Sequence, residues 1–147
     1  MRKIMSIIAM LVIILSVASH QVEAGEVYEK LCAVAKTEEG VKMISYDQFM
    51  ELRSSGEEYY LLDVLSSESY IEGHIPGARS FPLGEINKKT AENMLSKEDK
   101  IVVYCANFMC HASTNAAIAL QDMGYKVVDY KGGLKEWKEK GNDLVSK

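Results

Sequence analysis

The stretch that decides the fold is Ile101–Thr114, with the sequence IVVYCANFMCHAST. Its first residues form an apolar run of strand length, which is typical of a strand covered on both faces of a parallel sheet. Cys105 ends this run, Cys110 follows within a short loop, and the small residues from Ser113 onward predict a helix. This order places Cys105 at the carboxyl end of a strand, the edge at which open parallel sheets bind their ligands.

The same alternation extends to both sides of this stretch. Further strands are predicted at 41–45, 59–64, 78–81 and 126–129, and helices at 46–53, 68–71, 90–95, 113–123 and 134–140. Strands alternating with helices predict an α/β domain with an open, mostly parallel sheet of about five strands and helices on both faces. We assign residues 41–147 to this one domain.

Residues 1–24 differ in composition from the rest of the chain. Arg2 and Lys3 form a basic leader, and an uncharged, mainly apolar run follows from 4 to 17. This pattern is typical of a secretory signal peptide, and the run is short for a membrane span, which needs about 20 residues. We expect export to the periplasm or the exterior, with the segment removed or, if uncleaved, kept as a membrane anchor.

Residues 25–40 are expected to form an N-terminal extension ahead of the domain. Val27, Leu31 and Val34 lie at helical spacing and predict a short helix there. Cys32 lies in the same segment, and the sequence does not indicate whether it is free, pairs with another chain or reaches the site.

Charge and cysteine count exclude some classes of protein. The formal net charge is −4 over 147 residues, and charges of both signs are scattered, which gives no basic patch for nucleic acid. Three cysteines are too few for a disulfide scaffold, and an odd number leaves at least one thiol free or paired outside the chain. The fold must therefore be stabilised by its apolar core.

The predicted position of Cys105 also predicts its chemistry. The loop after it leads into the amino end of a helix, where unpaired backbone N–H groups and the positive helix end favour an anion. A thiolate is an anion, and the pKa of a cysteine falls at such a position. The sequence therefore predicts a nucleophilic Cys105.

Four stretches, in order, resemble motifs of the rhodanese (sulfurtransferase) family, and together they span roughly residues 42 to 141. They are a strand ending in Asp-Val (Leu61–Val64), a Gly-His-Ile-Pro-Gly-Ala motif (Glu72–Ala78), the strand that delivers the active-site cysteine (Val102–Cys105) and a closing Gly-Gly-x-x-x-Trp motif (Gly132–Trp137). The resemblance implies that Cys105 takes a sulfane sulfur as a persulfide and passes it to a thiophilic acceptor. A small sulfur donor, with a small thiol or a protein thiol as acceptor, would be the partners.

The chain also departs from the family pattern. Leu65 stands where the family commonly has Arg after Asp-Val, and the loop 106–112 is about two residues longer and lacks the usual Gly and Arg. The expected arginine falls on His111 or Ala112. We therefore expect thiosulfate to be a poor donor, and a phosphatase, which needs that arginine even more, is disfavoured.

Cys110 has three interpretations. It can be a resolving thiol that attacks an oxidised or persulfidated Cys105, half of a static disulfide, or an inert buried thiol at the helix start. Cys105, Cys110 and His111 offer at most three metal ligands, at a spacing that matches no common zinc module, so we expect no metal and no other cofactor.

Other side chains complete the predicted site. Its remaining loop residues are Ala106, Asn107, Phe108, Met109, His111 and Ala112. Phe108 and Met109 are expected to shield the sulfur or dock a partner, and His111 to act as a local cation or as a solvated loop residue. Asp63 and His74 are expected to support the site through hydrogen bonds, and Tyr130 and Trp137 to lie in the core.

Two other functions remain open from the sequence. A thiol–disulfide oxidoreductase or redox sensor would use Cys105 and Cys110 as a reversible pair. A non-catalytic binding module on the same fold would use the apolar Phe108-Met109 segment instead.

Overall fold

One six-stranded sheet organises the computed structural model, which describes residues 26–147. The strands are β1 (Lys36–Glu38), β2 (Val41–Ile44), β3 (Tyr60–Asp63), β4 (Ala78–Ser80), β5 (Lys100–Tyr104) and β6 (Lys126–Tyr130), in the order β1-β2-β6-β5-β3-β4. β1 is antiparallel to β2, and all other neighbours are parallel. The predicted α/β class is confirmed, with six strands rather than about five. The predicted signal peptide lies outside the described residues.

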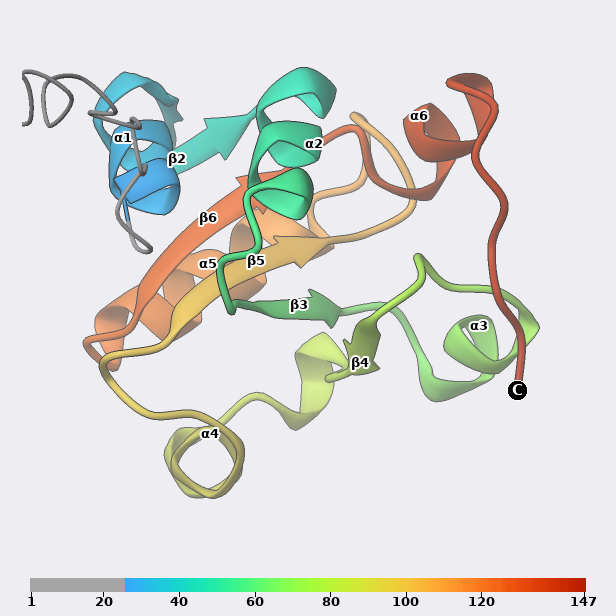
Figure 1. Cartoon of the computed structure of the whole chain (residues 1–147). Coiled ribbons are helices and arrows are strands. Elements are labelled where there is room, and N and C mark those ends of the chain that lie inside the picture. The colour runs from blue at the N-terminus through green and yellow to red at the C-terminus, as the bar shows by residue number, and fades with distance from the viewer. Residues whose placement is uncertain (1–25) are drawn as a thin grey trace, which may run out of the picture.

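Helices cover both faces of this sheet. They are α1 (Glu26–Val34), α2 (Tyr46–Ser54), α3 (Ser67–Glu72), α4 (Lys88–Met94), α5 (Ala112–Asp122) and α6 (Gly133–Glu139), with a short 3-10 turn η1 (Leu83–Glu85). α2 lies over one face and α5 over the other (Figure 1). Each strand and helix predicted within 41–147 is present, with its ends within two residues of the prediction.

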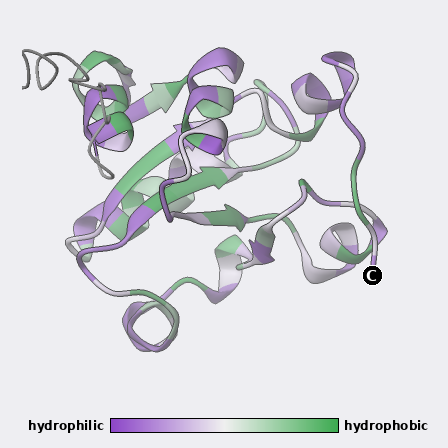
Figure 2. Ribbon diagram, viewed as in Figure 1, coloured by the Kyte–Doolittle hydropathy of each residue, from purple (hydrophilic) through white to green (hydrophobic). Residues whose placement is uncertain are grey.

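The central strands are apolar because both of their faces are covered. Figure 2 shows β3, β5 and β6 as mainly hydrophobic, whereas the helices alternate between the two characters. Along β5, Ile101 and Val103 pack with α5, and Val102 and Tyr104 pack on the opposite face with α1, α2 and α6. Alternate residues of one strand therefore serve two cores, as the period of a strand requires.

The predicted N-terminal extension is built into this architecture. Helix α1 is present, with Val27 and Leu31 buried as its spacing predicts, but Val34 is 67% exposed. The Tyr28 hydroxyl donates to the carbonyl oxygens of Ile101 (3.0 Å) and Lys126 (3.1 Å). This segment also supplies the edge strand β1, the strand that the sequence did not predict.

A buried carboxylate holds the start of α1 against the sheet. Glu57 accepts hydrogen bonds from the backbone N–H groups of Val27 (2.6 Å) and Tyr28 (3.3 Å), and pairs with Lys100 Nζ at 2.8 Å. Anions are favoured at a helix amino end, where backbone N–H groups lack partners. Within residues 26–147, no helix combines the length and apolar character that crossing a membrane requires.

Candidate active site

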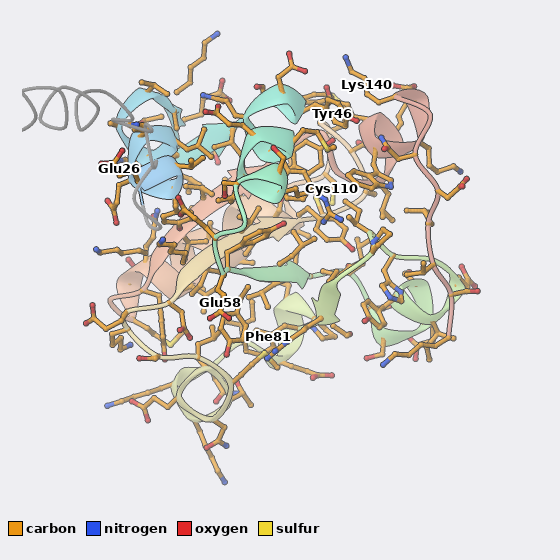
Figure 3. The ribbon with its side chains drawn as sticks, viewed as in Figure 1. Glu26, Tyr46, Glu58, Phe81, Cys110 and Lys140 are labelled. Carbon is orange, nitrogen blue, oxygen red and sulfur yellow. The ribbon has the colours of Figure 1, made fainter. Side chains whose placement is uncertain are left out.

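Cys105 follows β5 directly, at the edge of the sheet where its parallel strands end. The segment from Ala106 to His111 forms the loop to α5, and Cys110 lies beyond the arrowhead of β5 (Figure 3). A turn inside the loop is closed by the Cys110 N–H, which donates to the Asn107 carbonyl oxygen at 3.0 Å. The Asn107 side chain accepts from the Met109 N–H at 2.9 Å. The loop is thus folded back over the end of β5.

The sulfur of Cys105 is enclosed by this loop. Cys105 is 0% exposed, and its thiol donates to the Cys110 carbonyl oxygen at 3.3 Å. Its Sγ also lies 3.2 Å from Ser113 Oγ, in the first turn of α5. Burial and the contact with Cys110 raise the pKa of the Cys105 thiol. The prediction that the helix end lowers this pKa is therefore wrong for the closed loop, because burial outweighs the helix end.

The helix start stabilises the other thiol instead. Cys110 is half-buried, and burial acts to raise its pKa. Hydrogen bonds from the Cys105 thiol and from the backbone N–H groups of Ala106 and Ala112, together with the charge of Lys131, outweigh burial and lower the pKa of Cys110. All three cysteines are free thiols, and Cys32 lies in α1, packed against the opposite face of the sheet.

Lys131 brings a cation to the loop from another part of the chain. It follows β6, the strand beside β5, and its Nζ donates to the Cys110 carbonyl oxygen at 2.6 Å and to Thr114 Oγ1 at 2.8 Å. Thr114 in turn donates to the buried Asp129 at 3.0 Å. Sequence reasoning missed Lys131. Its position directly after the neighbouring parallel strand was the available signal, because such strands end at the same edge.

The Gly132-Gly133 pair explains how the β6–α6 turn can approach the loop. The N–H of Leu134 donates to the Cys105 carbonyl oxygen at 3.1 Å, and that of Lys135 to the Ala106 carbonyl oxygen at 2.9 Å. Gly133 has φ +58°, and a Cβ at this position would collide with the Cys105 carbonyl oxygen. Only glycine fits both requirements. This turn fixes the backbone on which the Cys105 side chain stands.

Asp63 and His74 are supporting residues, as predicted. Asp63 accepts from the Leu65 N–H at 2.9 Å and from the Tyr104 hydroxyl at 2.7 Å. His74 Nδ1 lies 2.8 Å from the Tyr70 carbonyl oxygen, and its ring stacks on that tyrosine. Burial raises the pKa of Asp63, against the opposing effect of these hydrogen bonds. Neither side chain contacts the sulfur atoms by a hydrogen bond among the described residues.

The tip of the loop has a different character from its base. Phe108 and Met109 are 58% and 83% exposed, and His111 is exposed at the start of α5 without a capping hydrogen bond from its side chain. The apolar tip therefore faces solvent and does not cover Cys105, which the Cys110 segment covers instead. The predicted core positions of Tyr130 and Trp137 are confirmed, since both are buried.

A family comparison decides what this arrangement belongs to. The model of the rhodanese-like domain matches residues 45–140, which includes Cys105 and the Gly-Gly turn. The chain belongs to the rhodanese-like domain family. Within the described residues, no cluster of three or more His, Cys, Asp or Glu side chains is placed to hold a metal ion.

Relatives of this rhodanese-like chain include named sulfurtransferases. The putative sulfurtransferase YtwF of Bacillus subtilis is 34% identical over 97 residues, 66% of this chain and 90% of that protein. The thiosulfate sulfurtransferase PspE of Escherichia coli is 36% identical over 75 residues, 51% of this chain and 70% of that protein. A crystal structure of the BH2092 protein from Bacillus halodurans matches with a TM-score of 0.65 at 30% identity, covering 71% of this chain and 76% of that one.

Coverage is lower for two other curated relatives. The chain spans 49% of the putative sulfur carrier protein YrkF of Bacillus subtilis and 42% of an HTH-type transcriptional regulator of Mycobacterium tuberculosis. The family and the fold are therefore shared with proteins that carry further segments. Sulfurtransferase and sulfur-carrier names recur among the relatives, which supports a role in sulfur transfer.

Proposed function

We propose that the protein is a sulfurtransferase or sulfur carrier that forms a persulfide on Cys105 and passes the sulfane sulfur to a thiol acceptor. The observation that carries this proposal is the position of Cys105, directly after β5 in the region that matches the rhodanese-like domain. The surrounding loop encloses its sulfur, which would protect a persulfide from water. Sulfurtransferases among the relatives give the same reaction class.

The closed loop sets a condition for loading. Cys105 Sγ is fully buried and its thiol donates to the Cys110 carbonyl oxygen, so a donor reaches it only when the 107–110 segment moves aside. Opening breaks the hydrogen bond that keeps the thiol protonated and exposes the sulfur to water, and both changes favour the thiolate. Donor access and activation of Cys105 are thus expected to occur together.

The charge of the site favours donors of low charge. The loop has no arginine, and the contacting cation, Lys131, already donates to Cys110 and Thr114. A doubly charged donor such as thiosulfate would lose its hydration with few compensating charges. We expect glutathione persulfide or a polysulfide to load Cys105 faster than thiosulfate, although one relative, PspE, is named a thiosulfate sulfurtransferase.

Intact-mass spectrometry tests the proposal. The reduced protein, its Cys105→Ser variant and its Cys32→Ser variant are incubated with glutathione persulfide, polysulfide or thiosulfate, and then transferred to a small thiol acceptor. Turnover should need Cys105 alone: Cys32→Ser should transfer sulfur at the wild-type rate, and Cys105→Ser should transfer none. Equal transfer by Cys105→Ser would refute the proposal and favour a binding module that uses the Phe108-Met109 tip.

We also propose that the protein works outside the cytoplasm, on the pattern of residues 1–24. A thiol of an exported protein, or a small thiol in the same compartment, would then be the acceptor. Mass spectrometry of the protein recovered from cells should find a chain that starts near Gly25, and a chain that starts at Met1 in a soluble fraction would contradict export with cleavage.

A further inference from the structure

The active-site loop holds a second sulfur that the proposed transfer reaction does not use. The carbonyl group of Cys110 receives two hydrogen bonds, from the Cys105 thiol at 3.3 Å and from Lys131 Nζ at 2.6 Å. Two cysteines and one lysine therefore meet at a single peptide unit. The loop turn that begins at Asn107 presses this unit against the end of β5.

A chain of buried groups fixes the position of Lys131. Its Nζ donates to Thr114 Oγ1, which donates to Asp129, a residue that is fully buried in β6. On the other side of the loop, Ser113 Oγ lies against Cys105 Sγ. Consecutive residues at the start of α5 thus contact the cysteine and the lysine, so the two sides of the site are held in register by one helical turn.

The groups that face Cys110 differ in charge. They are Cys105 from the end of β5, Lys131 from the β6–α6 turn, Asp129 from β6 behind Thr114, and the neighbouring His111 at the start of α5. Lys131 and the loop N–H groups favour a negative charge on Cys110, and burial lowers the acidity of Cys105 by raising its pKa. Burial also raises the pKa of Asp129, which reduces its opposing charge.

We propose that Cys110, held beside Lys131, is the internal acceptor for the sulfur on Cys105, so that the loop ends its cycle as a Cys105–Cys110 disulfide and releases hydrosulfide. This inference rests on the proposed persulfide at Cys105. The Cys110 thiolate attacks Cys105 Sγ of the persulfide, the Cys105–sulfane S–S bond breaks, and its electron pair leaves with hydrosulfide. The sulfane sulfur is reduced, the two cysteines are oxidised, and a dithiol reductant restores the loop.

The alternative site of attack is the outer sulfur, which would move the persulfide to Cys110. That path expels the Cys105 thiolate, whereas attack on Cys105 Sγ expels hydrosulfide. Lower-pKa thiols leave faster in thiol–disulfide exchange, and the buried Cys105 is the poorer leaving group. The surroundings therefore direct Cys110 to the inner sulfur. The protein would then reduce persulfides to sulfide, and a dithiol oxidoreductase reaction must follow it.

A single-turnover experiment in a Cys32→Ser background tests this route. The reduced protein receives one equivalent of glutathione persulfide, is quenched with N-ethylmaleimide, and is measured for free sulfide and intact mass. The Cys32→Ser protein should release one equivalent of sulfide and carry no maleimide, because its two remaining cysteines are joined. The added Cys110→Ser change should stop sulfide release and leave one extra sulfur, about 32 Da, on the protein.

Lys131 is a positioning residue, and its test is a pH profile. Lys131→Gln should slow sulfide release about threefold for each unit by which the pKa of Cys110 rises, since the loss of thiolate is partly offset by higher nucleophilicity. The deficit should disappear at high pH, and Lys131→Arg should restore the rate. Lys135→Gln, which removes an exposed lysine from the adjoining helix, is the matched control and should leave the profile unchanged.

The outcomes separate this inference from the proposed function. If Cys110→Ser gains no sulfur from any persulfide donor, the proposed function fails. If Cys110→Ser gains sulfur and the Cys110-containing protein keeps its persulfide equally long, the proposed function stands and the internal acceptor is refuted. A pH-independent deficit in Lys131→Gln would refute the role of Lys131.

Discussion

The loops that follow β3 and β5 begin side by side, yet they use their polar groups in opposite ways. Asp63 and Tyr104 are partners in the register of these two strands. After β3, polar groups are bonded to one another: Asp63 accepts from Tyr104, and the Tyr104 hydroxyl accepts from the Ile75 N–H at 3.1 Å. After β5, two free thiols face each other across one peptide unit. The first arrangement positions backbone, and the second stores reactive groups.

This difference shows what a sulfur site on this fold requires. A buried, mutually satisfied network is rigid, because any opening leaves polar groups without partners. The Cys105 contacts are weak sulfur hydrogen bonds, so the Cys110 segment can move at low cost. The β3 loop and the Gly132-Gly133 turn supply the fixed frame, and the β5 loop supplies the movable part.

The largest expected effect comes from the glycine on which the β5 loop rests. Gly133→Ala should destabilise the protein by about 3 kcal/mol, since it adds an overpacked contact with the Cys105 carbonyl oxygen to a left-handed φ of +58°. Urea unfolding measures the change. Gly141→Ala shares the positive φ without any close contact and should cost about 1 kcal/mol. Equal costs for the two variants would contradict the close packing of the turn on the loop.

The second effect tests whether the β3 network is only structural. Tyr104→Phe leaves the Asp63 carboxylate and the Ile75 N–H without a buried partner and should cost about 2 kcal/mol of unfolding free energy. Tyr125→Phe is the control, because the buried Tyr125 hydroxyl has no partner within residues 26–147. Tyr104→Phe should still load sulfur on Cys105. A loss of loading in the folded variant would give this network a role in the chemistry.

The third prediction concerns the two thiols. The pKa of Cys110 is lowered and that of Cys105 is raised, so the thiolate fraction of Cys110 should reach its plateau at a lower pH. Alkylation by iodoacetamide from pH 5 to 10, read on Cys32→Ser with each loop cysteine replaced in turn, measures both profiles. If Cys105 were alkylated at the lower pH, the closed loop would not be the major state in solution.

The smallest effect is expected at the tip of the β5 loop. Phe108→Ser and Met109→Ser remove largely exposed side chains and should change stability by less than about 0.5 kcal/mol. Either variant that lost more than about 1 kcal/mol would show that the tip packs onto the domain in solution. An unchanged stability would leave the tip available for contact with a partner.

The sequence predicted the elements of the sheet and the structural roles of Asp63 and His74, because apolar runs and turn residues carry local signals. It did not predict β1, whose residues Lys-Thr-Glu are all exposed and show no apolar alternation. That strand forms through pairing with β2, and exposed pairing leaves no hydrophobic pattern.

The sequence also placed Cys105 and Cys110 in one site but not in the right electrostatic order. That order depends on which sulfur is buried and on Lys131, which lies 21 residues from Cys110 in the chain. Contacts between the ends of neighbouring strands are set by strand order, which one sequence does not reveal. The cation absent from the loop was therefore found only once β6 lay beside β5.

The most direct test of the central claim locates the sulfane sulfur itself. The Cys110→Ser protein is loaded with glutathione persulfide, alkylated and digested with trypsin, and the peptide 101–126 is fragmented in the mass spectrometer. We predict one additional sulfur, about 32 Da, on Cys105 and none on the peptide that contains Cys32. Sulfur found on Cys32, or on neither cysteine while the donor is consumed, would contradict the account.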